Sequence, residues 1–338
     1  MAVSEKTKIT VWGSAAGLCS FPDCRTPCID SSGLVPISIG EVCHIVAQSF
    51  GGPRGNSPLS LEERDQFSNL ILLCPIHHRI IDENTTQFTI PILQSIKSDH
   101  ESWVRQTHSG FDEGKQIDNE IYAEYLDEWA DLISLDNWTD WSSAILSHDQ
   151  PHMGSTHDAS LEHLRTYLLS RYWPGRYQGL EKAFKNFWIV LKDFHELFRE
   201  HAEPEGPEGQ VLRTKKFYRI NRWDPEEYKR LSKMYNVHVG LVQNLMVELT
   251  RSANYLIKEV RNTIDPSYRI KEGWCVTEYG PTSDLTWVRQ THLYLDEEII
   301  NGLYPGFQLF KDQYKNRSFY FPLEPEDPHS PVLDGVIA

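Results

Sequence analysis

The spacing of cysteine and histidine near the N-terminus constrains the fold more than any other feature of this sequence. The stretch CSFPDC places Cys19 and Cys24 on either side of a Pro-Asp pair that favours a tight turn. The stretch CPIH places Cys74 and His77 close together, 50 positions after the first pair. Two such pairs provide the four ligands of a closed tetrahedral zinc site. We therefore predict a structural Zn²⁺ that contributes much of the folding energy of a small domain.

Cys28 is an alternative ligand for this site, because it also follows Cys24 at a short spacing. We favour Cys19 and Cys24, since the turn residues lie between them. Five of the six cysteines fall in the first quarter of the chain. In a cytosolic protein such clustering indicates metal binding and not a disulfide framework.

A second group of ligand-type side chains has a catalytic character. The segment 40–47, GEVCHIVA, has the texture of a strand and carries His44. His78 and Asp82 are four residues apart, so on a helix they project from the same face. Two such side chains can hold one divalent cation and leave positions open for water and a phosphate oxygen. A neutral histidine on an opposing strand can take a proton from the attacking water.

Residues 8–107 resemble the HNH endonucleases with the ββα-metal fold, in the branch of the family that carries a zinc knuckle. The resemblance rests on the upstream cysteine pair, CHIV at 43–46, NLILLC at 69–74, the histidines at 77–78 with Asp82 after them, and LQSIKSDHESW at 93–103. It covers under a third of the chain and carries no expectation for the remainder.

The resemblance implies a role for each matching residue. His44 would be the general base, and Asn69 would hold the opposing loop through hydrogen bonds. His78 would bind the catalytic Mg²⁺ or Mn²⁺, with Asp82 as a second ligand one helical turn later. His77 would belong to the zinc site. The implied reaction is hydrolysis of a phosphodiester bond.

The residue before the general base departs from the family pattern. Family members often have Asp or His there to bind the metal, whereas this chain has Cys43. A thiol is a poor magnesium ligand, so we expect Cys43 to pack in the core. Glu41 is a possible replacement, but strand periodicity places it on the same face as Cys43 and gives it little weight.

Two arginines are candidate phosphate contacts. Arg54 lies in the Gly-rich loop 49–58, where the backbone could approach a nucleic acid, and Arg79 follows the metal histidine. For each, a solvated surface arginine is an equally good interpretation. The chain has a net charge of −15, which argues against a general polyanion-binding surface. Any contact with DNA must therefore be local and metal-assisted, or supplied in part by a partner.

The domain organisation that we predict is α+β. A zinc-stabilised nuclease domain spans 1–107, a linker spans 108–118, and a mostly helical regulatory or assembly domain with some C-terminal strands spans 119–338. The individual elements predicted in the C-terminal part are a helix over 180–201, a helix start at Asp224-Pro225, a helix over 239–264, and strands at 285–295 and 317–321.

These observations predict a cytoplasmic endonuclease without a membrane span or signal peptide. The expected substrate is double-stranded DNA, and the family context suggests a regulated effector of bacterial anti-phage or restriction-type defence. We expect a homo-oligomer or a partner protein bound through the C-terminal domain. Two alternatives stay open: a non-catalytic, zinc-ordered binding module for nucleic acid or protein, and a ribonuclease.

Overall fold

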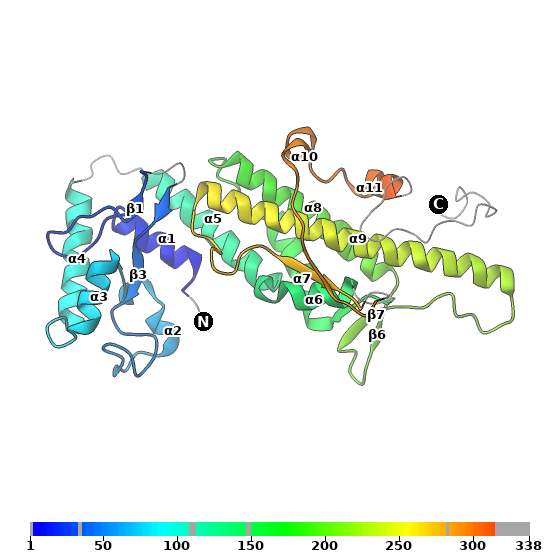
Figure 1. Cartoon of the computed structure of the whole chain (residues 1–338), viewed down its shortest axis with the longest axis horizontal. Helices are drawn as coiled ribbons and strands as arrows, with labels where there is room; N and C mark the ends of the chain where they lie inside the picture. Colours follow the sequence, from blue (N-terminus) through cyan, green and yellow to red (C-terminus); the bar gives the residue numbers. More distant parts are fainter. Residues whose placement is uncertain (1–2, 33–35, 108–112, 147–149, 282–283, 315–338) are drawn as a thin grey trace. The chain divides into compact units, whose positions relative to one another are not determined.

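Helices and short antiparallel sheets make up the protein, so the mixed α and β composition predicted from the sequence is confirmed. The computed structural model describes residues 3–32, 36–107, 113–146, 150–281 and 284–314. The chain divides into two compact units (Figure 1). The first contains residues 1–128 and 260–268, and the second contains residues 129–259 and 269 onward.

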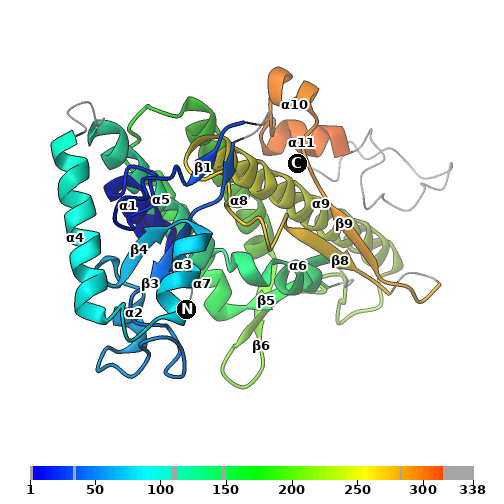
Figure 2. The same ribbon diagram turned by 60° about the vertical axis from the view of Figure 1, so that its left-hand side comes forward.

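The first unit is built on a ββα core. Its elements are α1 (Glu5–Ser14), β1 (Ile29–Asp30), β2 (Ile37–Ser38), β3 (Glu41–His44), α2 (Leu61–Arg64), η1 (Phe67–Asn69), β4 (Leu70–Leu73), α3 (Pro75–Glu83), α4 (Ile90–Thr107) and most of α5 (Glu113–Leu132). Strands β3 and β4 pair antiparallel, with Glu41 opposite Leu73 and His44 opposite Leu70. Helix α3 follows β4 directly and packs against both strands (Figure 2).

The local sequence explains this arrangement. All four residues of β4 are buried, so the strand lies inside the unit and fixes the register of β3. Pro75 occupies the first turn of α3, where its missing N–H leaves no hydrogen bond unmade. Buried side chains of α1, β4, α3 and α4, including Val11, Ile81 and Leu93, meet in one hydrophobic core.

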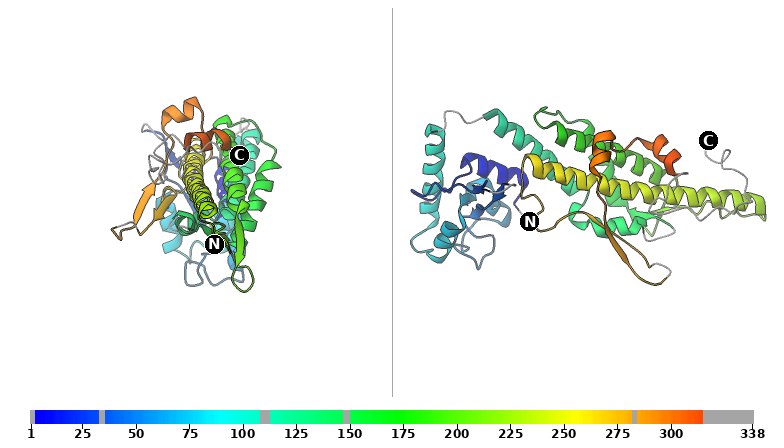
Figure 3. Two further views of the ribbon diagram at one scale, coloured as in Figure 1. Left: turned by 90° about the vertical axis from the view of Figure 1, so that its right-hand side faces the viewer. Right: turned by 45° about the horizontal axis from the view of Figure 1, so that its top comes forward.

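The second unit is mostly helical. Its elements are η2 (Leu135–Asn137), α6 (Trp138–Leu146), β5 (His152–Gly154), α7 (Ser155–Leu169), α8 (Gln178–Glu200), β6 (Ala202–Glu205), β7 (Val211–Thr214), most of α9 (Pro225–Thr263), β8 (Val276–Tyr279), β9 (Val288–Thr291), α10 (Asp296–Asn301) and α11 (Phe307–Tyr314). Strands β5, β7 and β6 form one sheet in that order, and β8 pairs with β9. Helix α9 is unbroken over its whole length (Figure 3).

The helices predicted for this unit are confirmed, but two predicted segments belong to one helix, and one predicted strand is shorter than expected. The expected helix over 180–201 is α8, and the helix start at Asp224-Pro225 leads into the helix expected over 239–264, so that both belong to α9. The strand expected over 285–295 is confined to Val288–Thr291. The strand expected at 317–321 lies outside the described residues.

Two segments differ from expectation. The stretch 204–209 ends β6 and forms the turn that leads into β7, and neither strand was predicted from the sequence. Helix α5 begins at Glu113, within the stretch expected to be a linker, of which 108–112 lie outside the described residues. Among the described helices, none has an apolar stretch long enough to cross a bilayer.

Candidate metal centre and catalytic site

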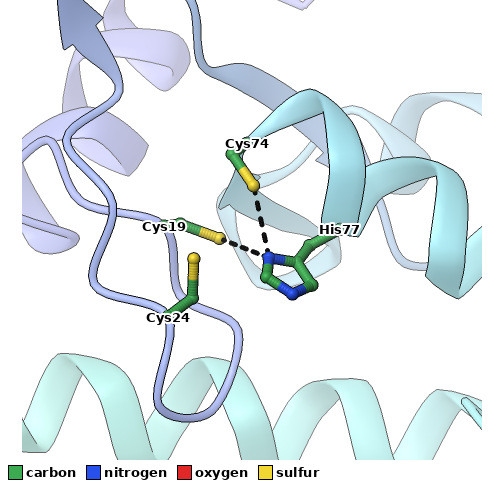
Figure 4. A group of neighbouring side chains, drawn as sticks. All are labelled: Cys19, Cys24, Cys74 and His77. Carbon is green, nitrogen blue, oxygen red and sulfur yellow. Dashed lines mark hydrogen bonds between the residues drawn. The ribbon is translucent and has the colours of Figure 1, made fainter.

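The four predicted zinc ligands lie together at the start of α3 (Figure 4). Their ligand atoms are all within 4.8 Å of one another. The Nδ1 atom of His77 is 3.2 Å from Sγ of Cys74 and 3.6 Å from Sγ of Cys19. Cys24 directs its sulfur toward the same space from the loop that follows α1. We call this group the Cys3His cluster.

The loop that carries Cys19 and Cys24 is shaped by its own backbone. The amide of Cys19 donates to the carbonyl of Thr26 at 2.9 Å, which closes the loop into a knuckle. Asp23 and Arg25 adopt positive φ angles of 59° and 50°, so the chain turns sharply on both sides of Cys24.

The knuckle is also anchored to the ββα core. The amide of Ser20 donates to the carbonyl of Leu72 in β4 at 2.9 Å. The ring of Phe21 stacks on the imidazole of His77, with centroids 3.9 Å apart and planes at 8°. These contacts hold the first ligand pair against the second.

Cys28 lies outside the Cys3His cluster. Its buried thiol donates to the carbonyl of Thr26 at 3.9 Å and lies beside Gly40, where a Cβ atom would be 2.7 Å from the sulfur. Burial raises the pKa of Cys28 to about 12. The geometry thus favours the two pairs chosen from the sequence over the set that includes Cys28. Three sulfurs and one imidazole nitrogen suit zinc.

A second group of ligand atoms surrounds His78. Its Nδ1 is hydrogen-bonded to Oε2 of Glu41, and its Nε2 is 3.3 Å from Oδ2 of Asp82. The ligand atoms of Glu41, Cys43 and His78 lie within 4.8 Å of one another. From the sequence, Glu41 was not favoured as a metal ligand, yet it contacts His78, the expected metal ligand, directly. We call Glu41, His78 and Asp82 the carboxylate–histidine cluster.

Cys43 is buried as expected, with its thiol donating to the carbonyl of Glu41 at 3.2 Å. Burial raises the pKa of Cys43 well above its ordinary value, and the nearby carboxylates of Glu41 and Asp82 raise it further. The thiol is therefore neutral at physiological pH. His78 has one carboxylate at each ring nitrogen, and carboxylate oxygens with an imidazole nitrogen are ligand types that suit Mn²⁺ or Mg²⁺ better than the thiol of Cys43 does.

His44, the expected general base, is paired with a carboxylate. Its Nε2 is 2.8 Å from Oδ1 of Asp65, the residue that ends α2. Asp65 also accepts a hydrogen bond from Nε2 of Gln48 at 3.2 Å. The side chain of His44 is 23% exposed, so water can reach it. No hydrogen bond or ion pair joins His44 to His78 within the described part of the chain.

Asn69 connects the end of β3 with the end of α2. Its Oδ1 accepts from the amide of Val46 at 2.9 Å, and its Nδ2 donates to the carbonyls of Val46 and Arg64 at 2.9 and 2.8 Å. The side chain is buried, so each of these bonds is shielded from water. Asn69 therefore holds the segment after His44 against the segment before Asp65, as a loop-holding residue requires.

Arg54 does not lie where a phosphate contact needs it. Its side chain is 4% exposed and donates to the carbonyls of Ile45 and Ile81 and to Oδ1 of Asp82, each at 2.6 Å. Arg54 thus fixes its loop onto the ββα core and positions one carboxylate of the carboxylate–histidine cluster. Arg79 is 80% exposed and pairs with Glu83 at 2.8 Å. Of the two candidates, only Arg79 is on the surface.

Three residues of the site were not identified from the sequence. Asp65 and Arg64 were not singled out, and Glu41 was given little weight. Asp65 and Arg64 carried no signal, because their partners come from distant segments. Arg64 is fully buried and donates to four backbone carbonyls of the loop between β3 and α2: Ala47, Gly55, Ser57 and Leu59. The capping box of Ser60 and Glu63 is the one local signal for the helix that carries both. Glu41 is the third.

Comparison with protein-family models and with curated proteins finds no match for this chain.

Proposed function

We propose that this protein is a metal-dependent endonuclease that hydrolyses phosphodiester bonds in DNA. One observation carries the proposal. The ββα core supports a histidine–aspartate pair, a carboxylate–histidine cluster that contains a partly exposed histidine, and a partly buried Cys3His cluster at the first turn of the same α3 helix. A general base, a hard-cation site and a zinc knuckle are the parts that this chemistry uses.

The pairing of His44 supports its role as the base. Because Asp65 accepts a hydrogen bond at Nε2, the neutral imidazole carries its proton there and keeps a lone pair on Nδ1. Nδ1 then takes a proton from water as the water oxygen bonds to phosphorus. The bond from phosphorus to the 3′ oxygen breaks, and that oxygen takes a proton from solvent. The products carry a 5′ phosphate and a 3′ hydroxyl.

His78 and Asp82 would hold the divalent cation, with Glu41 hydrogen-bonded to the other ring nitrogen of His78. Such a cation would supply Lewis-acid stabilisation of the charge that develops on the phosphoryl and leaving oxygens. Arg54 donates to one oxygen of Asp82 and leaves the other directed at His78. The zinc that we propose for the Cys3His cluster has a structural role, since all four of its positions are taken by protein ligands.

Duplex DNA is the substrate that we propose, bound through local contacts because the chain is strongly acidic. Arg79 is the exposed cation nearest in sequence to the carboxylate–histidine cluster. One nuclease centre cuts one strand at a time, so a double-strand break needs two copies of the chain or a partner. We assign the second unit to regulation or assembly, in a defence effector directed at foreign DNA.

Plasmid cleavage with Mg²⁺ or Mn²⁺ tests this proposal. We expect nicking by the wild-type protein and a loss of about 10²- to 10⁴-fold in His44→Ala, the usual contribution of a general base. His163→Ala, which removes an exposed histidine of α7, is the matched control and keeps full activity. Zinc content should be the same in all three proteins.

Two results would replace the proposal by one of the alternatives. A wild-type protein that binds DNA or another protein but cleaves no nucleic acid with either metal is a zinc-ordered binding module. Cleavage of structured RNA, with duplex and single-stranded DNA left intact in parallel reactions, makes the protein a ribonuclease.

A further inference from the structure

A third group of ligand-type side chains lies in the second unit, far along the chain from the nuclease residues. Glu200 is the last residue of α8, His201 follows it, and His238 lies in α9. Their ligand atoms are all within 4.8 Å of one another. Oε1 of Glu200 is 3.9 Å from Nε2 of His201. The two imidazole rings lie edge to face, with centroids 4.7 Å apart.

His238 provides an independent sign that a ligand belongs here. The residue is only 6% exposed, and its Nε2 is enclosed without a hydrogen-bond partner in the described structure. A buried imidazole nitrogen that lacks a partner costs free energy, whether it carries the proton or the lone pair. Buried polar atoms are otherwise nearly always satisfied, so this one calls for a partner that the described residues do not supply.

The backbone around His201 is well fixed. The amide of Lys215 donates to the carbonyl of His201 at 2.7 Å, which extends the β6–β7 ladder by one bond. The ring of Phe217 packs against the His201 ring, with centroids 4.4 Å apart. Glu200 is 61% exposed and can therefore move toward the two rings without disturbing packed neighbours.

We propose that Glu200, His201 and His238 bind a borderline divalent transition metal such as Zn²⁺. Two imidazoles and one carboxylate favour zinc, nickel, cobalt or copper over Mg²⁺ and Ca²⁺, which prefer oxygen alone. Zinc bonds of about 2.0–2.1 Å place tetrahedral ligand atoms roughly 3.3 Å apart. The 3.9 Å between Glu200 and His201 is close to that spacing, and a small movement of the exposed carboxylate closes it.

The metal would join three neighbouring elements of the second unit. His201 joins α8 to the β6–β7 hairpin, and His238 lies on α9, so one ion links all three. Three protein ligands leave one tetrahedral position for water or another donor on the exposed side of Glu200. The site is independent of the proposed nuclease activity, because none of its residues belongs to the first unit.

Metal content of the full-length protein tests the proposal. Wild type, His238→Gln and Glu200→Gln are saturated with Zn²⁺ at neutral pH, freed of excess metal by gel filtration, and measured for zinc per chain. We expect His238→Gln to bind one equivalent fewer than wild type. By titration, Glu200→Gln should bind this equivalent at least about tenfold more weakly. A tenfold excess of Mg²⁺ should not displace it.

His157→Gln is the matched control, because Nε2 of His157 is also enclosed without a partner but belongs to no ligand group in the described structure. It should keep the wild-type zinc content. Zn²⁺ should also slow hydrogen exchange over 202–214 in wild type and in His157→Gln, but not in His238→Gln.

Equal zinc content and equal affinity in wild type and Glu200→Gln would overturn the proposal, and so would displacement by Mg²⁺. Glu200 is on the surface, so this comparison decides the matter even if His238→Gln fails to fold.

Discussion

The Nε2 atom of His44 and the Oδ1 atom of Asp65 are 2.8 Å apart, although 21 positions separate the residues in the chain. His44 ends β3 and Asp65 caps the short helix α2, so the pair joins a strand to the loop that covers it. Asn69 bonds to both of these segments and holds them together. The orientation of the proposed base therefore depends on a carboxylate that no motif identified.

Replacing Asp65 by Asn should slow DNA cleavage by roughly 10- to 100-fold, the usual cost of removing a carboxylate that orients a functional histidine. The amide can donate to Nε2, which favours the tautomer with its proton on Nδ1, and this tautomer cannot accept a proton from water. We expect kcat to fall with little change in KM, measured under multiple turnover on a nicked-product assay.

Asp99→Asn is the control for this change, because Asp99 is an exposed carboxylate on α4 of the same unit. It should behave as wild type. If Asp65→Asn cleaves at the wild-type rate while remaining folded, the carboxylate does not position His44.

Glu41→Gln should raise the Mn²⁺ concentration needed for half-maximal cleavage by about tenfold or more, because a carboxylate that contacts His78 is lost. The comparison is Glu62→Gln, which removes an exposed carboxylate from α2. An unchanged metal requirement in Glu41→Gln would show that Glu41 serves only to orient His78.

Cys24 and Cys28, four residues apart in the chain, should respond differently to mutation. Cys24→Ser removes a ligand of the Cys3His cluster, and we expect one zinc equivalent fewer per chain. The free energy of unfolding of the first unit should fall by about 3 kcal/mol or more, the stabilisation that a ligand gives well above its Kd. Zinc content and chemical denaturation measure both effects.

Cys28→Ala should keep its zinc, because the sulfur of Cys28 lies outside the cluster. Its stability should fall only by the cost of a small cavity, about 1 kcal/mol. If Cys28→Ala loses zinc and Cys24→Ser retains it, Cys28 and not Cys24 is the zinc ligand.

The sequence identifies which cysteines and histidines lie together better than it identifies the residues that surround them. Cys74 and His77 are three positions apart at the start of a helix, so local geometry alone brings their ligand atoms together. Helices α8 and α9 follow from apolar spacing, which is a property of each segment by itself. Such features need no knowledge of distant contacts.

The supporting residues could not be predicted in the same way. Arg54 was a candidate phosphate contact because it lies in a Gly-rich loop, yet it bonds to two backbone carbonyls that no side-chain pattern reveals. Strands β6 and β7 are four residues long, and β6 is mostly exposed whereas β7 is half-buried to buried, so neither shows the alternation that identifies longer strands. Both cases depend on which distant segments meet.

Mutations of Arg54 and Arg79 should have different effects on protein stability and on DNA binding. Arg54→Ala leaves carbonyls and Asp82 without their donor inside the fold, so we expect the free energy of unfolding to fall by about 2–4 kcal/mol. Arg79→Ala removes an exposed pair and should change stability by less than about 0.5 kcal/mol.

The salt dependence of DNA binding should change in Arg79→Ala and not in Arg54→Ala. If Arg79 contacts a phosphate, Arg79→Ala lowers the slope of log K against log salt by about one unit. Arg54→Ala, tested where it remains folded, should leave the slope unchanged. If the slope is smaller in Arg54→Ala alone, Arg54 and not Arg79 contacts a phosphate.

His157 should make the second unit sensitive to acid. Its Nδ1 is 3.5 Å from Oγ of Ser134, and its ring packs against Trp141 with centroids 4.8 Å apart. Burial, with a smaller contribution from the nearby His195, lowers the pKa of His157 from 6.5 to about 4. The unfolded chain therefore takes up this proton first as pH falls, so stability is present above pH 6.5 and lost on the way to pH 4.

We expect this histidine to account for up to about 3 kcal/mol of the loss in unfolding free energy between those two pH values. His157→Gln stays neutral throughout and should flatten the acid limb, and we expect it to start from a lower stability at neutral pH because the ring contact with Trp141 is gone. Urea denaturation of both proteins at pH 7 and pH 4.5 gives the difference. His163→Gln, with an exposed ring, should keep the wild-type dependence. Parallel acid limbs for wild type and His157→Gln would mean that the ring takes up its proton within the folded protein.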